Sequence, residues 1–390
     1  SSAASDVYKR QVEDCGAEFV PNHMLFEGGH SVPRSYEIKA GTGSGYIHPM
    51  YDQIKKLSNV TVKTRAKFDD FIMDGDAVVG VTYREGYRFN AKLQSDDLEN
   101  KTGKTKTVRA KLGVMLAAGG FSRDIWFRQI QDPRVVPTTD STNQLGATAG
   151  VLVKSLGIGA APVQLCWLQF LPYTNPREKG FGVSVNFTNH ACMDFGIVVD
   201  RKTGKRFMDE NNTYVVKART TALQTLDNQA WVIVDSECPV LDKVIAKFDR
   251  LHSPYGKADT IEELCKQVNL PEKNVVKEVK AYNDALAAGK LEEMVPPCTY
   301  KKPHPVAKAP FYAVPFQGGM TATFGGPLIN TEGEVLDTEN HPVGNLYAIG
   351  NAAGGLFYDN YVGGAQLTAA GVFGMIVAEH VKALKSGKAA

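Results

Sequence analysis

The sequence has little excess charge of either sign and no long apolar run. Its 390 residues contain 44 lysines and arginines against 42 aspartates and glutamates, a net charge of +2. This balance gives no electrostatic reason to expect nucleic-acid binding or attraction to a membrane surface. Apolar runs end after about ten residues, whereas a membrane-spanning helix needs about 20. We therefore expect no transmembrane segment in this chain.

Cysteine is also sparse, and its spacing excludes the usual metal motifs. The six cysteines are Cys15, Cys166, Cys192, Cys238, Cys265 and Cys298. None forms a CxxC motif or lies beside a histidine at the spacing of metal ligands, so we predict no iron–sulfur or zinc site. Scattered buried thiols are the simpler interpretation, and they favour a reducing environment. The compartment itself is left open.

A third absence concerns a dinucleotide-binding motif. The end of the chain has a glycine-rich unit, with residues 344–355 reading GNLYAIGNAAGG, then Gly363-Gly364 and an apolar run at 367–377. This pattern predicts a buried strand, a glycine turn and a helix whose free N–H groups face a phosphate or a flavin edge. Its usual partner, an N-terminal strand–GxGxxG–helix, is not found. Residues 1–11, SSAASDVYKRQ, resemble a translated sequencing adapter, so we predict a non-native tail on an N-terminally truncated fragment.

The rest of the sequence predicts an α/β fold with an inserted domain. Alternating segments at 60–64, 76–83 and 108–116 are separated by turn signals and predict a β-meander. From about residue 166 aromatic residues become more frequent, and helical patterns occupy 260–268 and 274–288. We therefore expect residues 12–165 and 319–390 to form one α/β domain, and residues 166–318 to form a second, α+β domain.

Six motifs, in order over nearly the whole chain, resemble one flavoprotein family. They are AAGGF at 117–121, STNQLGA at 141–147, GKRFMDE at 204–210, APFYA at 309–313, FGG at 324–326, and LYAIG at 346–350 followed by Gly363-Gly364. The family is FAD-dependent oxidoreductase 2, which includes fumarate reductases, succinate dehydrogenases and 3-ketosteroid dehydrogenases. The resemblance implies a split FAD-binding domain of Rossmann-like, glutathione-reductase type, closed by a mobile α+β capping domain. The substrate would lie between the cap and the flavin.

The resemblance implies FAD as the cofactor and assigns positions that hold it. These cofactor positions are Ala66, Gly119, Gly120, Ala322, Gly350, Asn351, Gly363, Gln366 and Leu367. Asn351 stands where fumarate reductases have a glutamate and ketosteroid dehydrogenases an asparagine. Gly150 replaces a family aspartate, which removes one acceptor for the cofactor.

Four positions carry histidine or arginine in fumarate reductases and no cation here. They read Leu171, Tyr214, Thr321 and Tyr361. A dicarboxylate needs cationic partners to offset its desolvation, so these residues disfavour fumarate.

Tyr214 and Tyr361 match the pattern of ketosteroid dehydrogenases. That resemblance implies proton transfer by Tyr214, next to the carbon that exchanges hydride. It also implies that Tyr361 and the backbone N–H of Gly364 bind a ketone oxygen. The simpler alternative is that each tyrosine packs in the core, with its hydroxyl group hydrogen-bonded to one partner. The steroid enzymes have an additional residue and a proline near Tyr361, so the substrate is left open to other carbonyl-conjugated alkenes.

Further aromatic residues flank the predicted substrate pocket, which comprises Leu171, Tyr173, Thr321 and Tyr358. Tyr173 and Trp167 either wall an apolar substrate or pack the seam between domains, and packing is the simpler interpretation. Tyr358 and Asp359 either line the mouth of the pocket or form an ordinary exposed turn.

Together these features predict an FAD-dependent oxidoreductase that transfers hydride between flavin N5 and an activated C–C bond of an enone-like, even steroid-like, substrate. Its partners would be that small molecule and an electron donor or acceptor whose identity the sequence leaves open. One alternative is a fumarate- or urocanate-type carboxylate reductase, which needs a cation such as Lys217 or Arg219 in the cap. The other is an inactive fragment unable to hold FAD.

Overall fold

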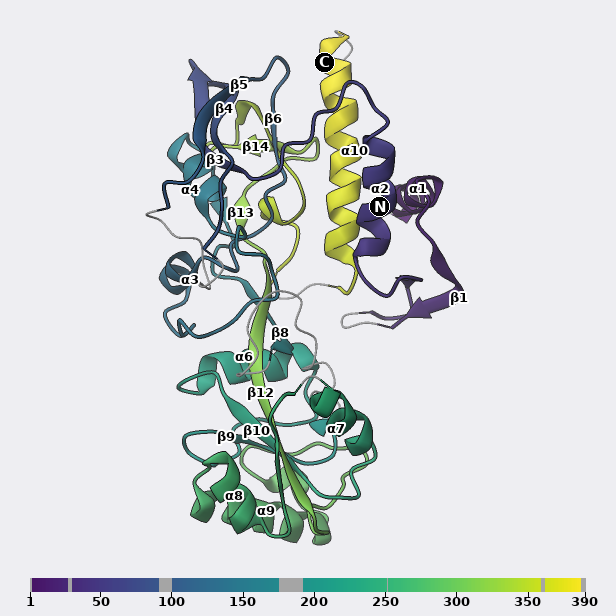
Figure 1. The fold of residues 1–390 in the computed structure, drawn as a ribbon, viewed down its shortest axis with the longest axis vertical. Helices are drawn as coiled ribbons and strands as arrows, with labels where there is room; N and C mark the ends of the chain where they lie inside the picture. The colour runs from purple at the N-terminus through teal and green to yellow at the C-terminus, as the bar shows by residue number, and fades with distance from the viewer. Residues whose placement is uncertain are drawn as a thin grey trace.

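Two lobes, one above the other, are joined by a long strand in the computed structural model (Figure 1). The structure describes residues 2–26, 30–90, 100–174, 192–250, 252–358 and 362–386. The joining strand is β12 (Phe311–Thr323), of which all but two residues are buried. Because β12 begins in the lower lobe and ends in the upper one, the residues near its upper end lie at the junction of the two lobes.

The lower lobe is built on an antiparallel sheet with the order β11-β12-β10-β9, and β8 pairs with the upper part of β12. Its other strands are β8 (Leu168–Thr174), β9 (Ile197–Asp200), β10 (Ala230–Val234) and β11 (Gly256–Ala258). Its helices are α6 (Tyr214–Gln224), α7 (Leu241–Arg250), α8 (Ile261–Val268), α9 (Glu272–Ala287) and the 3-10 turn η1 (Leu291–Glu293).

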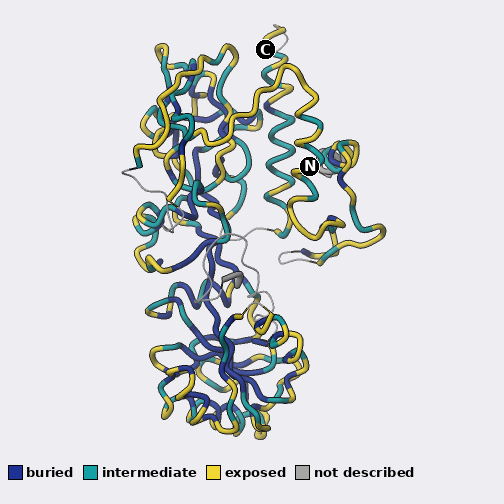
Figure 2. Tube along the Cα trace, viewed as in Figure 1, coloured by how far each residue is buried: buried dark blue, intermediate teal, exposed yellow. Residues whose placement is uncertain are grey.

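Strand β10 shows why this sheet is buried on both faces. Side chains of a strand alternate between the two faces of its sheet. Val232 and Val234 therefore join one apolar cluster, whereas Trp231 and Ile233 join another. Burial is deepest along these central strands (Figure 2).

The upper lobe contains a mixed sheet with the order β14-β15-β4-β3, in which β5 also pairs with β4 and β6 with β15. Its strands are β3 (Ala66–Asp74), β4 (Ala77–Glu85), β5 (Lys104–Arg109), β6 (Val114–Leu116), β14 (Glu334–Leu336) and β15 (Pro342–Ala348). An antiparallel meander is present as β3-β4-β5. The predicted strand 108–116 is divided, because β5 ends at Arg109 and β6, which pairs with β15, begins at Val114. The first predicted strand was misplaced, since residues 60–64 form no strand and Arg65, at φ 51°, directly precedes β3.

Short elements connect this sheet to the strand crossing, which is the region where β12 passes between the lobes and pairs with β8. They are α3 (Ile125–Gln131), α4 (Gly150–Gly157), β7 (Pro162–Val163), β13 (Gly326–Pro327) and η2 (Gly350–Ala352). β13 pairs with β7. The mixed α/β architecture with several sheets agrees with the predicted class, and the predicted domain boundaries stay predictions.

A helical group lies beside the upper lobe (Figure 1). It comprises α1 (Ser2–Asp14), the hairpin β1 (Phe19–Leu25) and β2 (Ser35–Ile38), α2 (Ser44–Ile54) and α10 (Ala365–Lys385). Most of the predicted adapter-like tail is helical here, and the ring of Tyr8 packs so tightly on Gly371 that a Cβ there would lie 2.2 Å from it. Whether residues 1–11 are native stays untested.

Helix α10 is a weak candidate for a membrane span and does not overturn the expectation that this chain has no transmembrane segment. Within the described residues this helix of 21 residues has the length and composition of such a span, and 6% of its most apolar window is buried. The apolar run seemed short in the sequence because Gly371, Gly374 and small polar residues interrupt it, yet all of them continue the helix.

Candidate functional site

A narrow cleft in the upper lobe brings together glycines from distant parts of the sequence. Its walls come from the turn after β6, the start of α4, β13 and η2. The predicted cofactor positions Gly119, Gly120 and Asn351 all lie in this lining, and Gly350 adjoins it at the start of η2. The structure therefore brings these four residues together, and their role in holding a cofactor stays a prediction.

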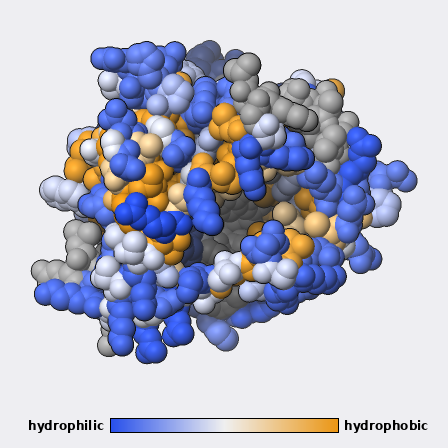
Figure 3. Space-filling model, turned by 90° about the horizontal axis from the view of Figure 1, so that it is seen from above, coloured by the Kyte–Doolittle hydropathy of each residue, from blue (hydrophilic) through white to orange (hydrophobic). Residues whose placement is uncertain are grey.

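The backbone approaches so closely around this cleft that side chains would not fit. A Cβ on Gly120 would lie 2.1 Å from Thr323 Oγ1, and one on Gly326 would lie 2.8 Å from the Ala352 carbonyl oxygen. Glycine is required at both positions because neighbouring parts of the chain occupy the space that a Cβ would need. From above, apolar side chains border a hollow at this end of the molecule (Figure 3). The use of this narrow cleft for FAD stays a prediction from the sequence.

The lower end of the cleft meets the strand crossing. Thr323, the last residue of β12, accepts a hydrogen bond through Oγ1 from the Phe121 N–H at 3.2 Å. Ala322, a predicted cofactor position, is 4% exposed and pairs with Gln169 of β8. Leu171 pairs with Gly319, and Thr321 adjoins Ala322. Two predicted substrate positions therefore lie within a few residues of the cleft wall.

Tyr214 is the first residue of α6, which packs against β8 and β12 below the crossing. Thr213 caps the helix, because its Oγ1 accepts a hydrogen bond from the Val216 N–H. The phenol is half-buried. The structure thus sets Tyr214 at the end of a capped helix that packs on the strands carrying Leu171 and Thr321.

A buried ion pair fixes the loop that leads into α6. The side chains of Arg206 and Glu210 are both 0% exposed, with Nη2 and Oε2 2.6 Å apart. Glu210 also accepts from the Val198 N–H, and Arg206 donates to the Pro296 carbonyl oxygen. Burial by itself lowers the pKa of Arg206, but its hydrogen bonds to Glu210 outweigh burial and raise it. This pair positions the start of α6 and does not itself face a ligand.

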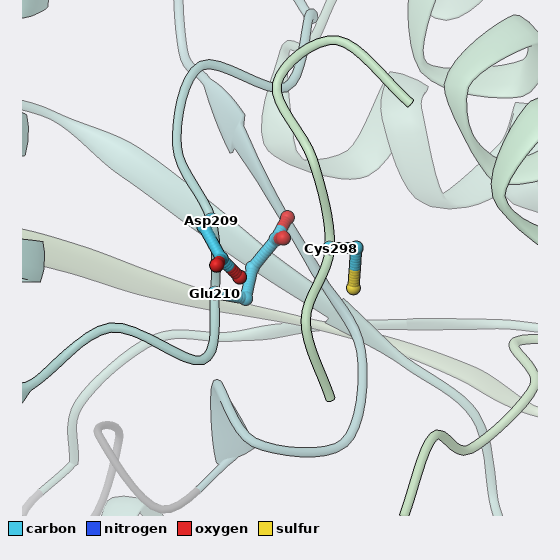
Figure 4. Close-up of side chains that lie close together, drawn as sticks. All are labelled: Asp209, Glu210 and Cys298. Carbon is cyan, nitrogen blue, oxygen red and sulfur yellow. The ribbon is translucent and has the colours of Figure 1, made fainter. Parts of the chain in front are cut away.

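Asp209, Glu210 and Cys298 place three ligand-type atoms within 4.8 Å of one another (Figure 4). Glu210 is engaged by Arg206, and Asp209 accepts from the Thr299 N–H and hydroxyl group. Burial raises the pKa of the Cys298 thiol to about 12, so no thiolate is present near neutral pH. The cluster is therefore a structural junction between two loops and a poor metal site.

The glycine pair at the start of α10 is held by residues that the sequence reasoning missed. The Gly363 carbonyl oxygen accepts from Ser35 Oγ at 2.9 Å and contacts His30 Nε2 at 2.9 Å. Gly364 has φ 81°, and a Cβ on it would lie 2.9 Å from Ser35 Oγ. His30 directly follows Gly28-Gly29, which is a weak signal for that residue, and no sequence signal singles out Ser35.

Other predicted positions lie away from the cleft lining. Ala66 is exposed at the start of β3, and Leu367 is 44% exposed on α10. The Nε2 atom of Gln366 is buried and has no hydrogen-bond partner within the described residues. Tyr358 is exposed, and its ring lies tilted against that of Trp167, with centroids 4.8 Å apart. Tyr361, Asp359 and the side chain of Tyr173 lie outside the described residues.

Comparison with known proteins identifies the family. Residues 12–367 match the family model described as an FAD binding domain. The acrylate reductase flavoprotein subunit of Shewanella woodyi is 32% identical over 94% of this chain and 71% of its own length. The urocanate reductase of Eggerthella lenta is 27% identical over 95% of this chain and 58% of its own length. The chain thus spans less than two thirds of the second relative.

Solved structures share the fold. The open conformation of a flavocytochrome c3 fumarate reductase superposes with a TM-score of 0.75 at 23% identity, over 97% of this chain and 62% of its own. A 3-ketosteroid-Δ4-(5α)-dehydrogenase from Rhodococcus jostii gives a TM-score of 0.69 at 20% identity, over 96% of this chain and 77% of its own. The predicted resemblance and the predicted cofactor are thereby confirmed. The chain belongs to the FAD binding domain family and is an FAD-dependent oxidoreductase.

Proposed function

We propose that the chain reduces a carbon–carbon double bond conjugated to a carbonyl group, in a small compound that carries at most one carboxylate. The observation that carries this proposal is the link between the glycine cleft and the strand crossing, made by the hydrogen bond from the Phe121 N–H to Thr323. In support, Leu171 and Thr321 lie within a few residues of Thr323 in the paired strands β8 and β12. Bound FAD supplies the hydride, and the chain's own residues orient the alkene and deliver a proton.

The relatives favour the carboxylate alternative over the steroid-like interpretation. Acrylate and urocanate, named in the two relatives above, are both unsaturated monocarboxylates. The structural likeness to a ketosteroid dehydrogenase, at 20% identity, supports the fold alone. A dicarboxylate stays disfavoured because Leu171, Tyr214 and Thr321 are uncharged.

The cation that the carboxylate alternative requires has a candidate on α6. Lys217 is 1% exposed, lies three residues beyond Tyr214, and its Nζ is 2.8 Å from Asp194 Oδ1. Residues three apart share a helix face. A single buried ammonium already paired with a carboxylate suits at most one substrate carboxylate, which supports a monoacid.

The proposal keeps the predicted assignments of domains and roles. Residues 12–165 and 319–390 form the FAD-binding domain, and residues 166–318 form the cap. Tyr214 donates the proton to the carbon beside the one that receives hydride, as a phenol with a pKa near 10 can do. Tyr361 and the Gly364 N–H bind the carbonyl oxygen.

A substrate panel tests the proposal. Flavin-loaded protein, supplied with electrons by a reduced viologen dye without oxygen, is offered acrylate, urocanate, an enone, a 3-ketosteroid and fumarate. We expect kcat/KM for a monocarboxylate to exceed that for fumarate by at least tenfold. Turnover that is fastest with fumarate or with the steroid would overturn the substrate assignment, and reduction of none of the five would overturn the activity.

A further inference from the structure

Two buried thiols of the lower lobe lie against each other. Cys192 is 0% exposed and Cys238 is 5% exposed, and both belong to the large apolar cluster of this lobe. The Cys192 thiol donates a hydrogen bond to Cys238 Sγ, and both cysteines are free. An isolated buried cysteine is chemically inert, whereas two thiols in contact can be joined with little movement of the backbone.

Cys238 lies just before helix α7 and is the more reactive thiol of the two. Its carbonyl oxygen accepts from the Leu241 N–H at 3.0 Å, and its Sγ accepts from the N–H groups of Val240 and Leu241. The hydrogen bond from Cys192 and these backbone N–H groups hold the pKa of Cys238 below its ordinary value, although burial opposes them. Helix N-termini favour the thiolate in this way. Cys238 is therefore the nucleophile of the pair, and Cys192 is the second thiol.

Cys192 begins a turn, residues 192–196, that reaches the proposed site. The Tyr300 hydroxyl group donates to the Gly196 carbonyl oxygen at 2.9 Å and so holds the far end of this turn. Asp194, in the middle of the turn, accepts from Lys217 Nζ of α6 at 2.8 Å. Because Asp194 is only two residues from Cys192, a shift of that cysteine is passed on to the partner of Lys217.

We propose that Cys192 and Cys238 form an oxidisable dithiol, which peroxide converts into an intramolecular disulfide that slows the enzyme. Cys238 Sγ attacks one peroxide oxygen and the O–O bond breaks. The other oxygen leaves as hydroxide and takes up a proton to give water, while Cys238 becomes a sulfenic acid. Cys192 Sγ then attacks that sulfur, the S–O bond breaks, and the hydroxyl group leaves as water with the Cys192 proton. Two electrons pass from the two sulfurs to one peroxide molecule.

The effect on turnover rests on the proposed function and adds regulation to it. A disulfide holds two sulfur atoms closer together than a hydrogen bond between thiols does, so oxidation draws the 192–196 turn toward α7. Lys217 then loses the carboxylate that holds it on the face of α6 shared with Tyr214. We expect kcat/KM for the best substrate of the panel to fall by about tenfold, the cost of one hydrogen bond to a charged group.

Peptide mapping tests the disulfide without any measurement of activity. Flavin-loaded protein is treated with hydrogen peroxide, quenched with catalase, alkylated and digested without reductant. We expect the peptides of Cys192 and Cys238 to be joined, and dithiothreitol to separate them. The exposed Cys166 is an internal reference, which a bulky maleimide should label while it leaves the buried pair unlabelled. Peroxide treatment that leaves both thiols free, or that joins either one to a different cysteine, would overturn the proposal.

Alanine variants separate the disulfide from other effects of peroxide. Cys192→Ala and Cys238→Ala each remove the cross-link, so both should keep wild-type turnover before and after treatment, and either one suffices if the other does not fold. Cys265→Ala is the matched control, because Cys265 is a buried thiol of the other apolar cluster of this lobe. This control should still lose turnover on oxidation and regain it with dithiothreitol.

The two measurements also distinguish failure of this inference from failure of the proposed function. A disulfide that forms while alkene reduction continues unchanged would overturn the regulatory role, and so would an equal loss of turnover in Cys192→Ala and Cys238→Ala. If no compound of the panel is reduced even before oxidation, the proposed function fails. Peptide mapping then still decides whether Cys192 and Cys238 form the oxidisable dithiol.

Discussion

The phenol of Tyr214 is the side chain on which the proposed proton transfer depends. Replacing it with phenylalanine keeps the ring and removes the proton. Because general acid–base catalysis contributes at least about a hundredfold, we expect Tyr214→Phe to lower kcat by about that factor while KM changes little. Steady-state kinetics with the best substrate of the panel measure both.

The matched control is Tyr255→Phe, since Tyr255 donates to Asp249 in the lower lobe. It should retain wild-type kcat. If Tyr214→Phe also keeps kcat within twofold, the acid is another group, and the half-buried phenol belongs to the packing of α6. The loop held by Arg206 and Glu210 would then serve stability alone.

At the scale of elements, Asp235 ties the proline-rich return of residues 303–310 to the end of β10. Its carboxylate is 1% exposed and accepts from the Ala307 N–H, the Lys308 N–H and His304 Nε2. Burial by itself raises the pKa of Asp235, but these hydrogen bonds outweigh burial and lower it below its ordinary value. The carboxylate therefore stabilises the fold while it is ionised.

The lowered pKa gives this stabilisation a defined pH dependence. It is fully present above the unfolded pKa of about 3.9 and is lost as pH falls through the lower folded pKa. At pH 7 we expect Asp235→Asn to lose about 3 kcal/mol of unfolding free energy, since one acceptor oxygen disappears. Denaturant unfolding from pH 7 to pH 3 should show the difference between wild type and variant shrinking only below pH 4. A difference that stays constant to pH 3 would contradict the assignment.

Local chemistry explains what the sequence could and could not predict. Glycine motifs such as Gly119-Gly120 and the turn at Gly350 were predictable because backbone geometry demands glycine there. The helix at 261–268 was predictable from its cap, Thr260. That the buried amide of Gln169 has no partner within the described residues was not predictable. It depends on the partner strand β12, about 150 residues away in the sequence, and on the bulge at Thr321. His30 and Ser35 were missed for the same reason, since their contact is Gly363.

At the scale of the whole molecule, the two lobes should respond differently to the cofactor. If the glycine cleft binds FAD, the ligand stabilises the segments that line it in proportion to its concentration over Kd. We expect hydrogen exchange to slow in residues 116–121, 148–152, 325–327 and 350–352 when FAD is added. Exchange through local openings of the lower lobe should not change, because such openings leave the cleft and its ligand intact. Protection that does not saturate with FAD, or that is confined to the lower lobe, would mean that this chain does not hold the cofactor in the cleft. That result would favour the alternative that the chain is an incomplete fragment unable to hold FAD.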